Sequence, residues 1–170
     1  KPGGSVLYNL INGTFDKDLY VVNSRGGNIQ GVKAYEKIEE IPPTDLAIIS
    51  IPAKQCISAI DYLAKEKSVK AFIVFSAGFS EESDEGALLE RQLLDVVDKA
   101  GVLMIGPNCS GFFNTKHQSI FTKPVPNLDP HGVDIISSSG GTITYIIESA
   151  MRIGLRFNSA WSIGNAAQVG

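Results

Sequence analysis

Short apolar runs alternate along the chain with longer amphipathic segments, which is the pattern of a parallel β-sheet wound with α-helices. The apolar runs are continuous, as strands covered on both faces are. Two intervening segments carry apolar residues at helical spacing, and Gly101 stands where the second helix should end. The pattern therefore predicts an α/β fold. Its expected strands are residues 19–23, 46–51, 71–76 and 102–105, and its expected helices are residues 54–67 and 86–100.

A second unit follows a proline-rich stretch. Pro124, Pro126 and Pro130 interrupt the regular pattern, which indicates a domain boundary near residues 124–132. Beyond it the chain predicts a strand at 133–137, a helix at 142–153 and a strand at 157–163. We therefore expect one domain over residues 1–128 and the beginning of another over residues 129–170. A single strand–helix–strand unit is small for a sheet, so we expect the second domain to be cut short.

The first residues form a glycine-rich segment that runs directly into an apolar helix. Lys1 to Ser5 read KPGGS, and Val6, Leu7, Leu10 and Ile11 follow at helical spacing. A glycine-rich loop that leads into a helix normally follows a strand. We therefore expect that the chain starts inside a strand-to-helix turn and that a first strand lies upstream.

Composition excludes several classes of protein. The chain has 170 residues, of which 44% are hydrophobic and 19% are charged, as in a folded globular protein. Its formal net charge of −3 gives no basic surplus for a nucleic acid partner. No apolar run approaches the roughly 18 residues of a membrane helix, so we expect a protein without a membrane partner. Cys56 and Cys109 form no paired motif, so we expect no metal site and a reducing, cytoplasmic setting.

The residues after each expected strand are small, kinked or hydrogen-bonding. Ligands of open parallel sheets bind outside the carboxyl ends of the strands, where such residues let a ligand approach the backbone. A nucleotide-like ligand is favoured, although each segment alone could be an ordinary tight turn. The segments are Asn23, Ser24, Arg25, Gly26 and Gly27; Pro52 and Ala53; Ala77, Gly78 and Phe79; and Gly106, Pro107, Asn108 and Cys109.

The end of the strand at 19–23 discriminates between nucleotides. Gly3 and Gly4 before a helix could cradle phosphates, but an NAD site would place an acidic residue after that strand. The chain has Asn23 and Ser24 there, followed by Arg25. A cation suits a phosphate on the ribose, which admits NADP or coenzyme A and disfavours NAD. Arg25 as a solvated surface charge is the alternative.

A second glycine-rich turn lies between the strand at 133–137 and the next helix. It reads Ser137, Ser138, Ser139, Gly140, Gly141. Free amides and the positive helix end could hold a phosphate there without a cationic side chain. The alternative is that a serine merely caps the helix.

No catalytic group stands out among the titratable residues. We expect His117 and His131 on the surface, because each lies in a polar or proline-rich stretch, and Cys109 as a small buried thiol. We expect solvation and helix capping, rather than a metal site, from an acidic cluster before the helix at 86–100. This cluster comprises Glu81, Glu82, Asp84 and Glu85.

Seven segments together resemble, in order, the nucleoside-diphosphate-forming acyl-CoA synthetases and the succinyl-CoA synthetase α subunit. This resemblance covers nearly the whole chain and implies a Rossmann-like CoA-binding domain, followed by the start of a flavodoxin-like ligase domain. The segments at 75–79 and 105–111 are the more specific ones. The segments are residues 1–6 (KPGGSV), 20–23 (YVVN), 45–53 (DLAIISIPA), 75–79 (FSAGF), 105–111 (IGPNCSG), 137–141 (SSSGG) and 162–165 (SIGN).

The resemblance also implies a reaction and a site. In that family, phosphate cleaves the acyl-CoA thioester to an acyl phosphate, a histidine takes the phosphoryl group, and a nucleoside diphosphate receives it. Transferred to this chain, four groups of residues would serve. They are Gly3, Gly4 and Ser5 at the CoA phosphates; Asn23, Ser24 and Arg25 at the adenosine end; Pro52, Ala53, Ala77, Gly78 and Asn108 along the pantetheine arm; and Ser139, Gly140 and Gly141 at the phosphate.

The chain departs from the family at the histidine. The phosphorylated histidine of the family lies in a glycine-rich loop, and neither His117 nor His131 stands in such a context. We therefore expect it outside this sequence and no synthetase activity from the chain alone. The resemblance implies a nucleotide-grasp domain or β subunit as partner, an oligomer, and ADP or ATP with Mg²⁺ bound only by those other parts. Two alternatives stay open: a module that senses acyl-CoA in an acyltransferase or regulator, and an NADP-dependent oxidoreductase.

Overall fold

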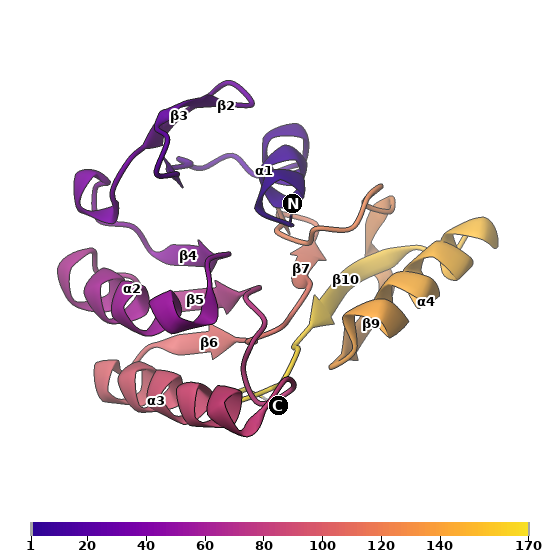
Figure 1. Ribbon diagram of the computed structural model, residues 1–170. Coiled ribbons are helices and arrows are strands. Elements are labelled where there is room, and N and C mark those ends of the chain that lie inside the picture. Colours follow the sequence, from indigo (N-terminus) through magenta and orange to yellow (C-terminus); the bar gives the residue numbers. More distant parts are fainter. Residues whose placement is uncertain (1, 170) are drawn as a thin grey trace.

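A three-stranded parallel sheet forms the centre of the fold (Figure 1). The computed structural model describes residues 2–169. The strands are β4 (Leu46–Ile49), β5 (Ala71–Val74) and β6 (Leu103–Ile105), in the spatial order β4-β5-β6. Helices α2 (Ala53–Glu66) and α3 (Asp84–Ala100) connect them, as the alternating pattern predicts.

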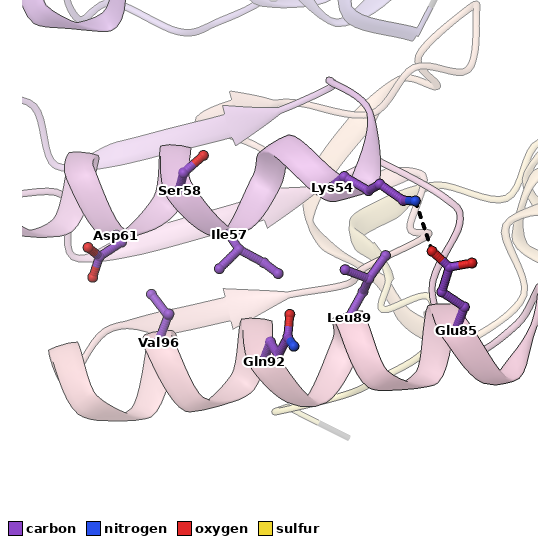
Figure 2. Close-up of a pocket in the computed structure, with 8 residues that line it drawn as sticks. All are labelled: Lys54, Ile57, Ser58, Asp61, Glu85, Leu89, Gln92 and Val96. Carbon is purple, nitrogen blue, oxygen red and sulfur yellow. Dashed lines mark ion pairs between the residues drawn. The ribbon is translucent and has the colours of Figure 1, made fainter.

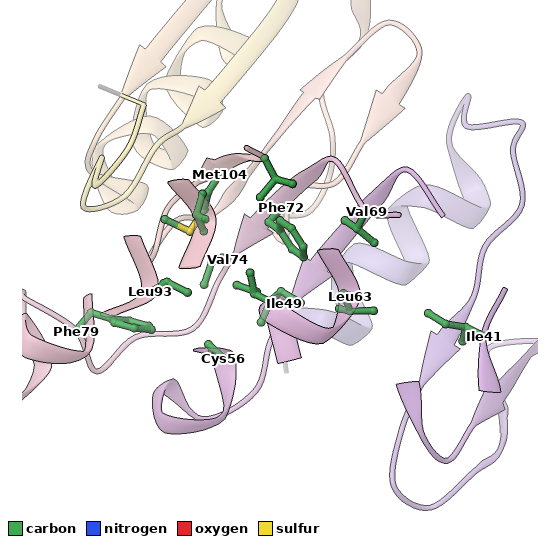
Figure 3. Close-up of a cluster of buried hydrophobic side chains, with 13 residues drawn as sticks. Ile41, Ile49, Cys56, Leu63, Val69, Phe72, Val74, Phe79, Leu93 and Met104 are labelled. Carbon is green, nitrogen blue, oxygen red and sulfur yellow. The ribbon is translucent and has the colours of Figure 1, made fainter. Parts of the chain in front are cut away.

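Successive residues of β5 face opposite sides of this sheet and pack against different helices. Phe72 and Val74 belong to the main core, which α2 and α3 cover with residues such as Leu63 and Leu93 (Figure 3). Ile73 belongs to a second cluster on the other side, where helix α1 (Pro2–Asn12) contributes Val6 and Leu10. The sheet is thus covered on both faces, which explains why its strands are continuous apolar runs.

A small second sheet contains β1 (Val21–Val22), β3 (Val32–Tyr35) and β2 (Gly27–Ile29), in that spatial order. Strand β1 is parallel to β3 and shorter than the expected strand at 19–23, while β2 and β3 form an antiparallel hairpin that the pattern did not predict. A short 3-10 helix, Ile38–Glu40, leads on to β4. The upstream strand stays an expectation.

A third sheet has the order β8-β7-β10-β9. Its strands are β7 (Gly111–Asn114), β8 (His117–Gln118), β9 (Leu128–Ser137) and β10 (Phe157–Ser162). Strands β9 and β10 are parallel, with helix α4 (Gly140–Arg152) between them in sequence, and β7 pairs antiparallel with β10. This sheet contains strands from both sides of the expected boundary at 128/129, which stays a prediction.

The segment after β10 joins the third sheet to the central one. Asn165 N donates to Pro107 O at 2.9 Å, and Ala167 N donates to Gly106 O at 3.2 Å. The side chain of Gln168 accepts a hydrogen bond from Met104 N at 2.7 Å. The chain therefore returns along the carboxyl end of β6 after it has left the central sheet.

Two helix termini show how local sequence sets the boundaries. Ser83 caps α3, because its hydroxyl accepts a hydrogen bond from Gly86 N at 3.1 Å, and Gly101 ends the helix in the left-handed conformation at φ 66°. The start of α1 differs from expectation. The loop predicted over Gly3, Gly4 and Ser5 is the first turn of α1, which begins at Pro2, a residue favoured at the first helical position.

Over residues 2–169, every helix is too short or too polar to cross a membrane.

Candidate functional site

The loops that follow β4, β5 and β6 are tied to one another at the carboxyl edge of the sheet. The buried hydroxyl of Ser76 accepts a hydrogen bond from Ile51 N at 3.1 Å and donates one to Ile51 O at 2.5 Å. Asn108 N donates to Ser76 O at 3.0 Å. Ser76 thus connects the loops after β4, β5 and β6 to one another. The small residues of these three loops therefore form one surface.

Ala53 and Gly78 meet within that surface. Gly78 has φ 101°, a conformation that side chains rarely adopt, and a Cβ atom there would lie 3.3 Å from Ala53 Cβ. Pro52 is the N-cap of α2 without a capping side chain, and the exposed Ala77 precedes Gly78. The structure therefore brings together the four residues of these two loops that the resemblance assigns to a pantetheine arm.

Glu81 organises the loop after β5. Its Oε1 accepts hydrogen bonds from Gly78 N at 2.7 Å and from Phe79 N at 3.2 Å. Burial opposes ionisation of Glu81, but hydrogen bonds from Asn165 and from these amides outweigh it and hold the pKa of Glu81 below its ordinary value. Glu81 is exposed, as expected of the acidic cluster, and in addition it orders this loop through its hydrogen bonds.

The first turn of α1 lies beside the end of β4. A Cβ atom at Gly3 would be 3.8 Å from the Cβ of Ser50, the residue directly after β4, and Gly4 O accepts a hydrogen bond from Gln30 Nε2 at 2.8 Å. The first amides of a helix have no intrahelical acceptors. Although Gly3, Gly4 and Ser5 are helical rather than a loop, the N–H groups of Gly3 and Gly4 precede the first intrahelical donor and are free at this edge.

Asn23, Ser24 and Arg25 form a tight turn after β1. Asn23 Oδ1 accepts a hydrogen bond from Arg25 N at 3.0 Å, and Asn23 O accepts one from Gly26 N at 2.8 Å. Arg25 is exposed. The structure therefore leaves open both interpretations of Arg25, as a phosphate ligand and as a surface charge.

A cavity of about 660 Å³ connects the central sheet with the start of α4. The cavity brings together Asn108 and the turn at residues 139–141, which the sequence analysis assigned to separate sites. Pro2, at the start of α1, also borders the cavity. Its lining comprises Pro2, Phe75, Asn108, Cys109, Ser110, Phe121, Ser138, Ser139, Gly140, Gly141, Thr144, Tyr145 and Glu148.

The N-terminus of α4 is both capped and open. Ser139 Oγ accepts a hydrogen bond from Thr142 N at 3.2 Å, so the capping interpretation is confirmed for this serine. A Cβ atom at Gly140 would collide with Ser110 Oγ, whereas one at Gly141 would meet nothing within 4 Å. Both glycines precede the first intrahelical donor, Ile143 N, and border the cavity, so their amides can still donate to an anion.

Sequence reasoning missed several lining residues. Tyr145 and Glu148 follow Gly141 at intervals of four and three residues, which places all three on one face of α4. That spacing could have identified them. Phe121 carries no comparable signal, because it reaches the cavity from the irregular segment after β8.

Cys109 is confirmed as a buried thiol. Its Sγ donates to Val74 O at 3.3 Å, and burial raises its pKa to about 11. Such a thiol is protonated near neutral pH and a poor nucleophile.

His117 contradicts the expectation of a surface residue. Its ring stacks on Phe112 with 4.7 Å between ring centroids and meets Phe15 edge-on at 5.4 Å. Its Nε2 is buried without a hydrogen-bond partner, and burial lowers its pKa to about 4. The expectation failed because Phe112 and Phe15 bury the ring from outside its polar stretch. His131 is exposed as expected, although it lies within β9.

A second hollow, of about 610 Å³, lies between α2 and α3 and contains none of the predicted site residues (Figure 2). Ile57 and Leu89 line it beside an exposed ion pair in which Lys54 Nζ and Glu85 Oε1 are 2.8 Å apart. Among residues 2–169, no group of His, Cys, Asp and Glu side chains is arranged to hold a metal ion.

The fold and the loop surface define an α/β domain. At the carboxyl edge of its sheet, backbone amides and the N-termini of helices are open to a ligand. A family model described as CoA binding domain matches residues 1–115. The chain belongs to this family of CoA-binding domains. The resemblance to the acyl-CoA synthetase family and the expected Rossmann-like fold are therefore confirmed.

The comparisons with known proteins also show which larger proteins contain related domains. The chain is 36% identical over 99% of its length to the ADP-forming acetate–CoA ligase I of Archaeoglobus fulgidus, and covers 24% of that protein. It is 36% identical over 89% of its length to subunit alpha of the ADP-forming acetate–CoA ligase II of Pyrococcus furiosus, and covers 33% of it. The chain thus spans about a quarter to a third of the length of these relatives.

A solved structure matches over the whole chain. It is the acetyl-coenzyme A synthetase 1 of Ca. Korarchaeum cryptofilum in complex with phosphate and ADP. The TM-score is 0.90 at 28% identity, with 100% of this chain and 36% of that chain covered. The homologues are therefore ADP-forming acyl-CoA synthetases, as the resemblance implied.

Proposed function

We propose that this chain is the CoA-binding part of an ADP-forming acyl-CoA synthetase, which interconverts acyl-CoA, ADP and phosphate with a carboxylic acid, ATP and CoA. One observation carries the proposal. The cavity that begins at the Asn108 loop continues to the free amides of Gly140 and Gly141. A thioester carbon held between these two features would have a phosphate-binding turn beside it.

The residues present fit coenzyme A. Gly78 leaves room beside Ala53 where a side chain would intrude, as a narrow pantetheine arm requires. The free amides of Gly3 and Gly4 and the hydroxyl of Ser5, in the first turn of α1, would donate to the pyrophosphate. Arg25 is exposed and can reach the ribose phosphate from the turn that it shares with Asn23 and Ser24. Pro52, Ala77 and Asn108 complete the proposed path.

The turn at Ser139, Gly140 and Gly141 would hold phosphate. The related Korarchaeum synthetase was solved in complex with phosphate and ADP, which supports an anion site in a protein of this fold. The helix dipole and the free amides would hold the phosphate without a cationic side chain. Phosphate bound there would lie close to the thioester that it attacks.

Other parts of the enzyme would complete the cycle. The described residues offer neither a metal cluster nor a histidine in an open glycine-rich loop, so we assign ADP or ATP, Mg²⁺ and the phosphorylated histidine to a nucleotide-grasp domain or β subunit. The alpha subunit among the relatives supports such a division, and assembly into an oligomer would bring the parts together. The two free, buried cysteines fit a cytoplasmic setting.

The alternatives fit less well. An NADP-dependent oxidoreductase is not favoured, because the related proteins are CoA ligases. An acyl-CoA sensor would use the same CoA site but would need no phosphate at α4. Phosphate binding therefore distinguishes a synthetase from a sensor.

Calorimetric titration of the chain with CoA and with NADP tests the proposal. We expect saturable heat with CoA and a rise in melting temperature, because a ligand that binds only the folded state stabilises it. Tight NADP binding without CoA binding would contradict it.

A further inference from the structure

A hydrogen-bonded relay connects two carboxylates to the Asn108 side chain. Asn165 lies in a turn three residues after the end of β10, and its carboxamide contacts the loops after β5 and β6. Its Nδ2 donates to Glu90 Oε2 at 2.8 Å and to Glu81 Oε2 at 2.5 Å. Its Oδ1 accepts from Asn108 Nδ2 at 3.3 Å.

The charges at one end of this relay fix the polarity of the other end. An ionised carboxylate can only accept hydrogen bonds, so Glu81 and Glu90 must face the NH₂ group of Asn165. The oxygen of Asn165 then faces Asn108, which must offer its own NH₂ group in return. This leaves Asn108 Oδ1 as the unused acceptor of a residue that lines the cavity.

Backbone contacts hold the relay in place. Asn165 N donates to Pro107 O at 2.9 Å, which anchors it beside the Asn108 loop. Glu81 also accepts from Gly78 N and Phe79 N, which anchors the opposite end in the loop after β5. The relay therefore spans both loops proposed to hold the pantetheine arm, and Asn165 supplies the link from beyond the third sheet.

We propose that Glu81, Glu90 and Asn165 are positioning residues that orient Asn108 so that its Oδ1 accepts an amide N–H of the CoA pantetheine arm. This inference rests on the proposed CoA site. An oriented Asn108 presents one acceptor, whereas a freely flipping carboxamide would present a donor half of the time. The relay thus selects ligands that carry an N–H group at this point of the arm.

Two CoA analogues test this inference, each with one pantetheine amide N–H replaced by an ester oxygen. Their affinities for the chain are measured by calorimetry. We expect the unaltered chain to bind one analogue about three- to tenfold more weakly than CoA, which corresponds to one hydrogen bond. In the double variant Glu81→Gln/Glu90→Gln, and separately in Asn165→Ala, that difference should vanish. Glu85→Gln is the control, because it removes a charge from the same acidic cluster but lies in the hollow between α2 and α3.

The outcomes separate the two proposals. If the unaltered chain binds CoA and both analogues equally, or if the variants keep the difference between ligands, the relay does not orient Asn108 while the CoA site stands. An equal loss of affinity for all three ligands in the variants shows a purely structural role and also overturns the inference. If the unaltered chain binds no CoA at all, the proposed function fails and the inference fails with it.

Discussion

Gly140 lies so close to the hydroxyl of Ser110 that a Cβ atom on the glycine would collide with Ser110 Oγ. Ser110 is itself buried, and its amide donates to the Ser162 hydroxyl at 3.0 Å. The start of α4 is therefore packed directly against the segment that leaves β6. This contact joins the two halves of the proposed site.

Alanine at the two glycines should separate packing from phosphate binding. Gly140→Ala should destabilise the chain by about 1–3 kcal/mol, because the added methyl group overpacks against Ser110. Gly141→Ala meets open space and should leave stability unchanged or raise it by up to about 1 kcal/mol, since alanine favours a helix. Urea unfolding measures both effects.

Gly141→Ala then becomes a clean probe of the anion site. It borders the cavity, so its methyl group should weaken phosphate binding about tenfold while the chain stays folded and CoA affinity stays the same. Titration with inorganic phosphate measures the change. Unaltered phosphate affinity in this variant would reduce the turn to a serine-capped helix start.

Arg25→Glu tests the adenosine end of the CoA site. If Arg25 contacts the ribose phosphate, the substitution should weaken CoA by about tenfold or more, the size of a lost charge-assisted hydrogen bond. Dephospho-CoA lacks that phosphate and should lose far less. Calorimetric titration of both ligands gives the comparison, and equal losses would show that Arg25 does not contact the phosphate.

The burial of His117 predicts a loss of stability in acid. Its pKa falls from 6.5 in the unfolded chain to about 4 in the folded one, so the folded state favours the neutral ring. The resulting stability is complete above pH 6.5 and is lost as the pH falls towards 4. Partial burial limits the effect to the order of 2 kcal/mol.

His117→Phe should flatten this pH dependence, because phenylalanine keeps the contacts with Phe112 and Phe15 and removes the unpartnered nitrogen. The exposed His131 supplies the control, since His131→Gln should leave the profile unchanged. Urea unfolding at pH 7 and pH 4.5 decides the matter. An identical acid loss in the chain and in His117→Phe would assign the effect to other groups.

The chain alone should take up no acid-labile phosphate from acyl-CoA and phosphate or from a nucleoside triphosphate. His117 stacks on Phe112 with its Nε2 buried, and the exposed His131 does not line the cavity. Mass spectrometry would detect phosphohistidine. Its appearance at either residue, and its loss on mutation of that residue, would contradict the account.

The central sheet and its helices could be predicted because their signals are local. The apolar run at Phe72 to Val74, the Ser83 cap and the terminating Gly101 each depend on a few neighbouring residues. The β2–β3 hairpin was missed because its turn places Gln30, a residue that is not glycine, at φ 55° before Gly31. Gly31 is a turn signal, but glutamine before it does not indicate the left-handed conformation that this tight turn requires.

Some residues of the candidate site could likewise be predicted from the sequence, and others could not. The small residues after the strands could be found by their position at strand ends, and the structure places Ala53 beside Gly78 and Asn108 on the cavity. The relay from Glu81 through Asn165 could not be found, because Asn165 is 57 residues from its partner Asn108. Contacts between residues so far apart in the sequence depend on how the third sheet packs relative to the central sheet.

Chemical-shift mapping of the chain on addition of CoA tests the central claim most directly. The account predicts that the largest amide shifts fall at Gly78, at Asn108 and in the turn at residues 23–25, since these line the proposed path. The hollow between α2 and α3 provides the contrast, because Ile57 and Leu89 should not move. Shifts confined to that hollow, or no shifts at saturating CoA, would contradict the proposed site.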